Sequence, residues 1–392
     1  MTNSIHILAP TSAEPLSTID HFKQLSPMPA FDPIIREFIK AMASALMNAR
    51  YKSYPELVAL GFWLRTQHRS LKSKRPNNSQ RALGTVVHFT PSNVDTMFIY
   101  SWVCGLFVGN KNIIRVATQS SESQDNLLTV LNELMGQPAF SAIAARNLFV
   151  KYDKYSEWSH AFSLVADARV MWGGDDSVQA IRQLPTKPRT REISFADRYS
   201  AAVINLQGDS GNATAEAIAK RLWSDTLPFA QQACSSPRVI YWLGDTNHQA
   251  PFFGYVSAHA DQLLEPNIAL RNEQLVLSQY AQAVCNAEAL QYGSVSVVTT
   301  DTVAPLLEMH QGQMTYLVVR IDSLDDIVKT QTDKLQTLAY AGCSVADFDR
   351  LLSNPQLSGV DRLVPLGSAL DFNTTWDGMD LLSMLSRTIS IE

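Results

Sequence analysis

The sequence lacks the patterns that hold many small proteins together through disulfides or metals. It contains four cysteines, Cys104, Cys234, Cys285 and Cys343, which are widely scattered and form no Cys-x-x-Cys pair. None of them has a histidine at metal-ligand spacing. Disulfide frameworks and structural zinc sites usually show such spacings, so we expect no disulfide and no bound metal.

Long apolar runs and an excess of positive charge are also missing. The most apolar helix-like stretch, residues 97–108, is well short of the roughly 18 residues that a membrane span needs. The first residues lack the basic start and apolar block of a secretory signal. The formal net charge of -5 argues against broad contacts with nucleic acid or anionic lipid. We expect a cytoplasmic protein with no membrane span and no nucleic-acid partner.

The Gly-x-Gly-x-x-Gly fingerprint of dinucleotide-binding domains is absent as well. A dinucleotide would therefore have to be held in another way. What the chain does have is 46% hydrophobic and 18% charged residues over 392 positions. This balance is typical of packed globular proteins, and the length suits two domains.

The first half of the chain alternates between strand-like and helix-like segments. Apolar residues recur at helical spacing over 34–71, with a break near Tyr54-Pro55, and predict a helical N-terminal layer. Such alternation predicts a parallel sheet with helices on both faces. The predicted strands lie at 84–89, 112–116, 147–150 and 168–172, and the helices between them end at Val108 or span 123–135 and 156–165.

A second region of alternation follows a strand predicted from Ala201. The polar segment 208–212 reads as a loop, and 213–223 is an amphipathic helix. We expect a second α/β domain that runs to about residue 350. Its further strands and helices are predicted at 235–242, 274–289, 294–299 and 316–321.

Arg115 is a candidate cofactor residue because of its place in the first region. It stands at the C-terminal end of a predicted parallel strand, the edge where doubly wound sheets bind ligands. A planar guanidinium matches the oxygens of a 2′-phosphate better than an ammonium does. The alternative is a surface ion pair, which is the commoner role for an arginine taken by itself.

Gly173 and Gly174 end another predicted strand, just before a helix predicted over 177–184. Glycines there let a ligand approach the backbone N–H groups of a helix N-terminus, which favours a pyrophosphate. Against this, Asp175 and Asp176 add negative charge where the anion would dock, and both are ordinary N-cap residues. The residues themselves leave both interpretations open.

Cys234 differs from the other cysteines in its neighbours. It lies in Gln231-Gln-Ala-Cys-Ser-Ser-Pro-Arg238, after a predicted helix and before an apolar strand. Small polar neighbours give hydrogen bonds and little apolar cover, a setting in which a thiol can be activated. The alternative is a small buried hydrophobe, the usual role of a free cysteine, and the interpretation we give to the other three.

Several segments together resemble the fatty acyl-CoA reductase family of bacterial luminescence operons, which is similar to the aldehyde dehydrogenase superfamily. The resemblance is specific as an ordered set and covers roughly three quarters of the chain, from residue 88 to about 387. The segments are His88-Phe-Thr-Pro-Ser-Asn93, Gly105-Leu-Phe-Val-Gly-Asn110 with Arg115-Val116, Trp172-Gly-Gly-Asp175, Asp197-Arg-Tyr-Ser200, the Cys234 segment, Asp361-Arg-Leu-Val-Pro-Leu-Gly367, Ala369-Leu-Asp-Phe372 and Trp376-Asp-Gly378.

The resemblance implies a fold and a set of site residues. The fold is α/β and aldehyde dehydrogenase-like: a Rossmann-like NADPH-binding domain with its helical N-terminal layer (1–205), a catalytic domain with the cysteine (206–350) and a C-terminal segment (351–392) that returns to the cofactor domain or to an oligomer interface. The resemblance implies that Cys234 is the nucleophile and that Asn93 donates a hydrogen bond to the oxyanion. The cofactor-binding residues that it implies are Thr90, Pro91, Arg115, Gly173 and Gly174. The basic side chain of Arg115 favours NADPH as the cofactor.

The implied reaction is the reduction of an acyl-CoA or acyl-protein thioester to an aldehyde through an acyl-Cys234 intermediate. Aldehyde-oxidising relatives carry a water-activating glutamate, and the matching region here, residues 194–200, has none. A thioester kept from water persists until hydride arrives. Alternatives are a CoA-acylating aldehyde dehydrogenase working toward acyl-CoA and a weakly active scaffold that docks an acyl-transferring or acyl-activating partner enzyme. Homo-oligomerisation is a superfamily expectation.

Overall fold

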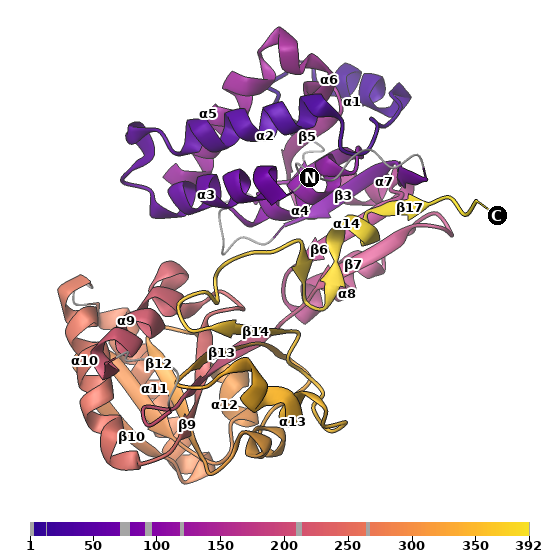
Figure 1. The fold of residues 1–392 in the computed structure, drawn as a ribbon. Helices are drawn as coiled ribbons and strands as arrows, with labels where there is room; N and C mark the ends of the chain where they lie inside the picture. Colours follow the sequence, from indigo (N-terminus) through magenta and orange to yellow (C-terminus); the bar gives the residue numbers. More distant parts are fainter. Residues whose placement is uncertain are drawn as a thin grey trace. The chain divides into compact units, whose positions relative to one another are not determined.

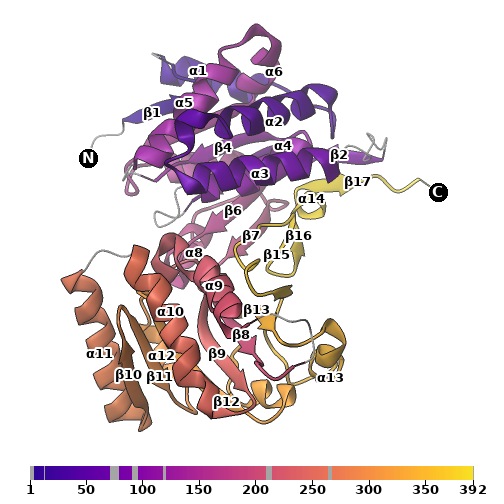
Figure 2. The same cartoon turned by 60° about the vertical axis from the view of Figure 1, so that its left-hand side comes forward.

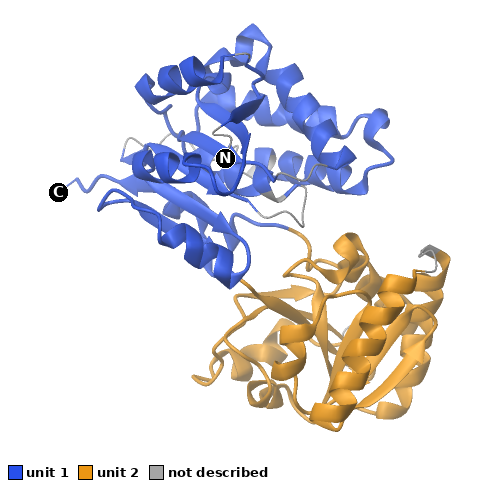
Figure 3. Cartoon of the chain, turned by 180° about the vertical axis from the view of Figure 1, so that it is seen from behind, with its two compact units in different colours: residues 1–196, 372–392 blue, residues 197–371 orange. Residues whose placement is uncertain are grey.

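The computed structural model describes residues 4–12, 14–70, 79–90, 96–117, 121–208, 214–263 and 267–391. The chain divides into two compact units, Met1–Ala196 with Phe372–Glu392 and Asp197–Asp371 (Figure 3). Each unit is built on a largely parallel sheet, so the predicted α/β class is confirmed. The unit limits fall at 196/197 and 371/372, whereas the sequence placed them at 205/206 and 350/351. The difference arises because β8 (Tyr199–Ile204) and β14 (Arg362–Pro365) pair within the second sheet.

The sheet of the first unit has the order β1-β5-β4-β3-β6-β7 (Figure 1). The strands from β5 to β7 are parallel, and β1 joins the edge antiparallel. Numbered along the chain, the parallel strands follow the order 3-2-1-4-5 of a doubly wound Rossmann-like sheet. These strands are β1 (Ile5–Ala9), β3 (Thr85–Phe89), β4 (Lys111–Arg115), β5 (Asn147–Tyr152), β6 (Ala168–Trp172) and β7 (Arg191–Phe195).

The strand order reverses between β3 and β6, which are neighbours in the middle of this sheet. In doubly wound sheets, ligands bind outside the carboxyl ends of the strands at such a reversal. Because β3, β4 and β6 run parallel, Thr90, Arg115 and Gly173 lie at the same edge of the sheet. The strand order therefore brings these predicted cofactor residues to one edge of the sheet, although they are far apart in the sequence.

Helices cover both faces of the first sheet. Neighbouring side chains of a strand point to opposite faces, and accordingly Val86 packs in one hydrophobic cluster and Val87 in another. The Val86 cluster includes residues of α2 (Pro33–Leu46), α3 (Pro55–Ser70), α4 (Met97–Phe107), α5 (Glu122–Met135) and α6 (Ser141–Ala144). The Val87 cluster includes residues of α1 (Pro15–Gln24), α7 (Trp158–Val165) and α8 (Asp175–Arg182).

The predicted break in the N-terminal helical layer is confirmed. Helix α2 ends at Leu46 and α3 begins at Pro55, and the two lie side by side in both views (Figures 1 and 2). The start of α2 follows from its first residues. The Asp32 carboxylate accepts a hydrogen bond from the Ile34 N–H at 2.9 Å, and Pro33 occupies the first helical position, where a missing N–H costs nothing.

The C-terminal segment packs within the first unit. Phe372 stacks on Trp376 with ring centroids 4.6 Å apart and contacts the ring of Tyr100 at 4.4 Å. Strand β17 (Ser386–Thr388) pairs antiparallel with β2 (Gln80–Ala82). The remaining elements here are the two-strand pair β15 (Thr375–Trp376) and β16 (Met379–Asp380), followed by α14 (Leu381–Met384).

The sheet of the second unit has the order β10-β11-β12-β9-β8-β13-β14. All neighbouring pairs are parallel except β10 with β11. One face is covered by α9 (Ala215–Thr226) and α10 (Gln249–Leu263), as Figure 2 shows, and the other by α11 (Ile268–Cys285), α12 (Ala304–Met309) and α13 (Asp349–Leu352). The further strands are β9 (Pro237–Leu243), β10 (Glu288–Tyr292), β11 (Val295–Thr299), β12 (Thr315–Ile321) and β13 (Leu335–Ala341).

No helix within the described ranges has both the length and the apolar character that a membrane crossing requires.

A buried polar network spans the middle of the first sheet. The His88 ring bonds Ser101 Oγ through Nδ1 at 3.0 Å and Asn112 Oδ1 through Nε2 at 3.1 Å. Because an amide oxygen accepts but cannot donate, Nε2 carries the proton and Nδ1 accepts. Asn112 Nδ2 in turn donates to Asn147 Oδ1 at 2.8 Å. Burial lowers the pKa of His88 to about 4, so that the ring is neutral at pH 7 and acts as a structural group.

Replacing His88 by leucine should destabilise the first unit. The variant leaves Ser101 and Asn112 buried without their partner, at a cost of about 2 to 4 kcal/mol. His88 has a lower pKa in the folded chain than the ordinary 6.5. Its contribution to stability is therefore present above pH 6.5 and is lost as the pH falls toward 4. Urea unfolding at pH 7.5 and at pH 5 should show a smaller pH dependence for His88→Leu than for the wild type.

The matched control is His160→Leu, because His160 is exposed on α7 of the same unit. Equal unfolding midpoints for the two variants would contradict a structural role for the His88 network.

Candidate active site

Of the four cysteines, Cys234 has the setting best suited to chemistry. None of the four forms a disulfide among the described residues. Cys104 and Cys343 are buried, and burial raises the pKa of both, for Cys343 to about 11. Cys234 is half-buried and follows a short 3₁₀ turn, Pro228–Gln231, that leads into β9. Buried thiols with raised pKa values are inert, which leaves Cys234 and Cys285 as the accessible thiols.

The turn before Cys234 has an unusual backbone. Phe229, Ala230 and Gln231 have φ angles of 59°, 49° and 64°, in the left-handed region that side chains other than glycine disfavour. The fully buried Gln231 amide offsets this cost. Its Nε2 donates to the carbonyls of Pro237 at 2.8 Å and Thr315 at 2.9 Å, and its Oε1 accepts from the Thr315 N–H at 3.0 Å.

The segment 310–315 supports that turn from beside it. The Gln313 N–H donates to the Ala230 carbonyl at 2.9 Å. Gly312 has φ +79°, and a Cβ there would lie 2.7 Å from the same carbonyl oxygen, so a larger residue would clash. His310 accepts from the Gly312 N–H at Nδ1 and donates from Nε2 to the Thr315 carbonyl. Burial lowers the pKa of His310 to about 3, with the Arg238 charge acting in the same direction, so the ring is neutral.

Two neighbouring strands hold Cys234 at both its sulfur and its backbone. In the order β9-β8-β13 the N-terminal ends lie side by side, because these strands are parallel. The fully buried Gln336 of β13 donates from Nε2 to Cys234 Sγ at 3.4 Å. The Ser200 hydroxyl of β8 donates to the Cys234 carbonyl at 2.7 Å. The nucleophile candidate is therefore fixed at the N-terminal edge of the second sheet.

Arg238 places a charged group in the same loop. Its Nη1 donates to the His310 carbonyl at 3.3 Å, and its Nε is buried without a hydrogen-bond partner among the described residues. Burial lowers the pKa of this guanidinium from its ordinary value, while the charges of Asp197 and Cys234 oppose the shift. The loop thus combines a thiol, an amide donor and a desolvated cation.

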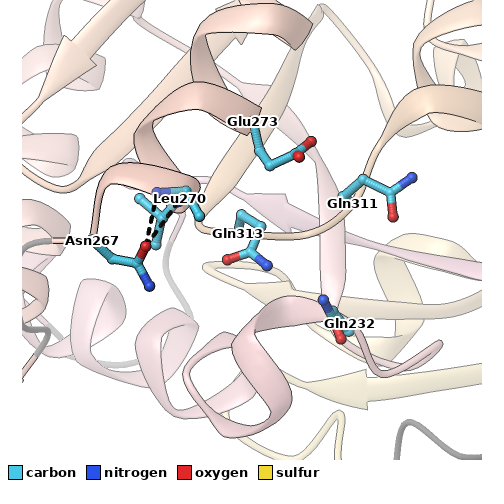
Figure 4. Close-up of a pocket in the computed structure, with 7 residues that line it drawn as sticks. Gln232, Asn267, Leu270, Glu273, Gln311 and Gln313 are labelled. Atoms are coloured by element: carbon cyan, nitrogen blue, oxygen red, sulfur yellow. Dashed lines mark hydrogen bonds between the residues drawn. The ribbon is translucent and has the colours of Figure 1, made fainter.

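A polar pocket of about 440 Å³ adjoins this loop within the second unit. Figure 4 shows Gln313 at its centre, with Gln232 from the cysteine loop on one side and Glu273 of α11 on the other. Amide groups both donate and accept, so the lining suits amide-bearing ligands, and the Glu273 carboxylate disfavours an anion there. Its lining residues are Gln232, Asn267, Ala269, Leu270, Glu273, Gln311 and Gln313.

In the first unit, Thr90 and Arg115 contact each other at the carboxyl edge of the sheet. The Thr90 hydroxyl donates to the Arg115 carbonyl at 2.6 Å. The Arg115 guanidinium lies 5.3 Å from the ring centroid of Tyr152, and its Nε is buried with no hydrogen-bond partner in the described part of the chain. An arginine stacked on an aromatic ring and short of an acceptor suits an incoming phosphate.

Gly173 and Gly174 lie at the same edge, where β6 leads into α8. Gly173 has φ +156°, and a Cβ there would lie 3.2 Å from Cβ of Ser177. A Cβ on Gly174, which caps α8, would meet nothing within 4 Å. Gly174 therefore leaves open space beside a helix N-terminus, whereas a side chain on Gly173 would press against Ser177. Asp175 and Asp176 bring negative charge to the first turn of that helix, but the N-cap is Gly174 and neither aspartate, so the predicted N-cap role is wrong.

The other predicted site residues are not all described. Asn93 and Pro91 lie outside the described residues, so the oxyanion and cofactor roles expected of them stay predictions. No group of three or more metal-binding side chains is found among the residues that the structure describes. Sequence reasoning did not single out Gln336, Ser200 or Arg238, although the last two stand in segments that carried the family resemblance.

Solved structures with a similar fold are aldehyde dehydrogenases. Aldehyde dehydrogenase 21 from Physcomitrella patens superimposes with a TM-score of 0.70 at 11% identity, over 95% of this chain and 88% of that chain. Lactaldehyde dehydrogenase from Escherichia coli superimposes with a TM-score of 0.66 at 13% identity, over 95% of this chain and 88% of that chain. The NAD+ complex of an aldehyde dehydrogenase from Bacillus cereus superimposes with a TM-score of 0.68 at 12% identity, over 91% of this chain and 83% of that chain. The chain thus has an aldehyde dehydrogenase-like fold, as predicted.

Within this fold class, residues 59–388, which include every strand of the two large sheets except β1, match one family. The chain belongs to the acyl-CoA reductase (LuxC) family. The family resemblance drawn from the ordered sequence segments is therefore confirmed.

Two curated relatives carry related names. The chain is 23% identical over 171 residues to the long-chain acyl-protein thioester reductase of Aliivibrio fischeri, covering 41% of this chain and 32% of that protein. It is 26% identical over 172 residues to long-chain acyl-protein thioester reductase 2 of Photobacterium leiognathi, covering 42% of this chain and 33% of that protein. The match thus spans about a third of the length of each relative.

Replacing Gln231 by glutamate should disrupt the cysteine loop. A carboxylate in place of the Nε2 donor would face the carbonyls of Pro237 and Thr315, and the expected loss of stability is about 2 to 4 kcal/mol. Unfolding in urea measures this loss. Gln232→Glu is the control, because Gln232 is its half-buried neighbour on the pocket wall. If both variants unfolded at the same urea concentration, Gln231 would not be the anchor of the loop.

Proposed function

We propose that the chain is an NADPH-dependent reductase that converts an acyl thioester, on CoA or on a protein, to an aldehyde through a covalent acyl-Cys234 intermediate. The observation that carries the proposal is the half-buried Cys234 thiol contacted by the Gln336 amide, in a chain of the acyl-CoA reductase family. The names of the two curated relatives support the same reaction class.

The chemistry of the first step falls to Cys234. Its thiolate attacks the carbonyl carbon of the thioester, the C–S bond to the donor breaks, and the donor leaves as a thiolate. Asn93 and a backbone N–H near the cysteine are proposed to hold the oxyanion that forms, and a donor of this kind typically contributes about 2.7 to 4 kcal/mol. The acyl group is then bound to Cys234 as a thioester.

The fate of that thioester depends on water. When bound, the nicotinamide cofactor supplies a hydride to the acyl carbon. Hydrolysis would require a carboxylate that activates water, and the two carboxylates near the matching segment are engaged elsewhere. Glu192 pairs with Arg169 and Arg182, and Asp197 pairs with Lys334 at 3.2 Å. This pairing supports reduction of the acyl-Cys234 thioester over its hydrolysis.

The cofactor residues proposed are Arg115, Thr90, Gly173 and Gly174, together with Pro91, which follows Thr90 in the sequence. The buried Nε of Arg115 lacks a partner among the described residues, and Gly174 leaves open space at the start of α8. Both features suit a phosphorylated dinucleotide. Arg115 would hold the 2′-phosphate, which distinguishes NADPH from NADH.

Cys234→Ser should abolish aldehyde formation. A hydroxyl cannot replace a thiol as nucleophile without a base beside it, so NADPH consumption with a long-chain acyl-CoA should fall by more than about a hundredfold. Cys285→Ser, which changes the other half-buried thiol, should retain activity. Undiminished aldehyde formation by Cys234→Ser, measured by gas chromatography, would disprove the covalent mechanism.

Arg115→Leu should weaken the binding of NADPH and not that of NADH. Losing a charged contact to the 2′-phosphate should raise KM for NADPH by about 10- to 100-fold and leave KM for NADH nearly unchanged. The control is Arg189→Leu, since Arg189 is exposed in the same unit. Equal effects on the two cofactors would show that Arg115 does not bind the 2′-phosphate.

A further inference from the structure

We propose that Gln336 activates Cys234 as an N–H donor to the reacting sulfur, and that a hydrogen-bond relay from Arg362 through Thr337 fixes the orientation of the Gln336 amide. The inference rests on the proposed function, because it concerns the nucleophile of that reaction. The inference adds Gln336, which contacts the reacting sulfur, and two residues, Thr337 and Arg362, that position Gln336.

The position of Gln336 is fixed by its backbone and by burial. Its side chain is fully buried, and its Nε2 lies 3.4 Å from Cys234 Sγ. The backbone N–H of Asp361 donates to the Gln336 carbonyl at 2.8 Å, which joins β13 to the segment that leads into β14. An amide in this setting has little freedom to move away from the sulfur.

The direction of each hydrogen bond in the relay follows from donor chemistry. An arginine side chain has donors and no acceptor. Arg362 Nη1 therefore donates to Thr337 Oγ1, at 3.3 Å. The one hydroxyl proton of Thr337 is then directed to Gln336 Oε1, also at 3.3 Å. Because Oε1 is held as the acceptor, the NH2 group of the amide is the end that faces the sulfur.

All three hydrogen bonds of the relay thus point toward Cys234. The guanidinium charge lies at the far end, and each bond polarises the next in the same sense. A donor aimed at sulfur stabilises a thiolate more than a neutral thiol, because hydrogen bonds to ionised acceptors are stronger. The arrangement favours the form of Cys234 that attacks a thioester.

The same strand also holds the backbone of Cys234. The Thr337 N–H donates to Ser200 Oγ at 3.2 Å, and the Ser200 hydroxyl donates to the Cys234 carbonyl at 2.7 Å. Gln336 and Thr337 therefore fix the sulfur directly and the carbonyl through Ser200. The contact between Gln336 and Cys234 is part of a connected network and not a chance approach of two side chains.

The test is the pH dependence of Cys234 alkylation by iodoacetamide, followed by peptide mass spectrometry without acyl substrate or cofactor. Gln336→Met should move the midpoint of the rate profile upward by about one pH unit, a tenfold change in thiolate population. Gln336→Glu should move it further, because a carboxylate repels the thiolate. Thr337→Val should give a smaller upward shift, while Thr337→Ser, which keeps the hydroxyl, should match the wild type.

The control for losing a buried glutamine is Gln124→Met, since Gln124 is also buried but lies on α5 of the first unit. It should lower the melting temperature without moving the alkylation midpoint. Unchanged midpoints in both Gln336 variants would overturn the inference. Because this assay needs no turnover, that result would leave the proposed reaction standing, whereas activity retained by Cys234→Ser would overturn the reaction itself.

Discussion

The arrangement around Cys234 depends on the buried amide of Gln231. This amide joins the turn before the cysteine to the start of β9 and to Thr315, through three hydrogen bonds. Three consecutive residues with positive φ cost about 1 to 3 kcal/mol each, and such a conformation persists only where surrounding contacts hold it. Because the amide and the 310–315 segment hold them, Cys234 stays at the N-terminal edge of its sheet, next to Ser200 and Gln336.

Among the described residues, the loop around Cys234 brings together a neutral imidazole, an amide donor and a guanidinium. His310 is buried and neutral, and both of its ring nitrogens are occupied by backbone groups. The Gln336 amide and the Arg238 guanidinium offer hydrogens or positive charge. Such donors stabilise negative charge on the sulfur. These contacts fit the proposal that the acyl group is transferred to the Cys234 thiol.

Much of the fold could be predicted, since the apolar periodicity of β3, β4, β5 and β6 is local and strong. Cys234 could be singled out from its polar neighbours, and the family from its ordered segments. Gln336 could not, because its sequence neighbours resemble an ordinary buried strand and β13 itself was not predicted. Its contact with Cys234 arises from the strand order of the sheet, which brings residues 102 positions apart together. Asn93 remains a prediction from the family resemblance.

The central claim is that an acyl group passes through Cys234 and leaves as an aldehyde. The most direct measurement is mass spectrometry of the protein after incubation with a long-chain acyl-CoA in the absence of NADPH, followed by addition of NADPH. The account predicts one acyl adduct on the Cys234 peptide, which NADPH discharges as aldehyde. An adduct on another residue, no adduct at all, or release of the free fatty acid would contradict it.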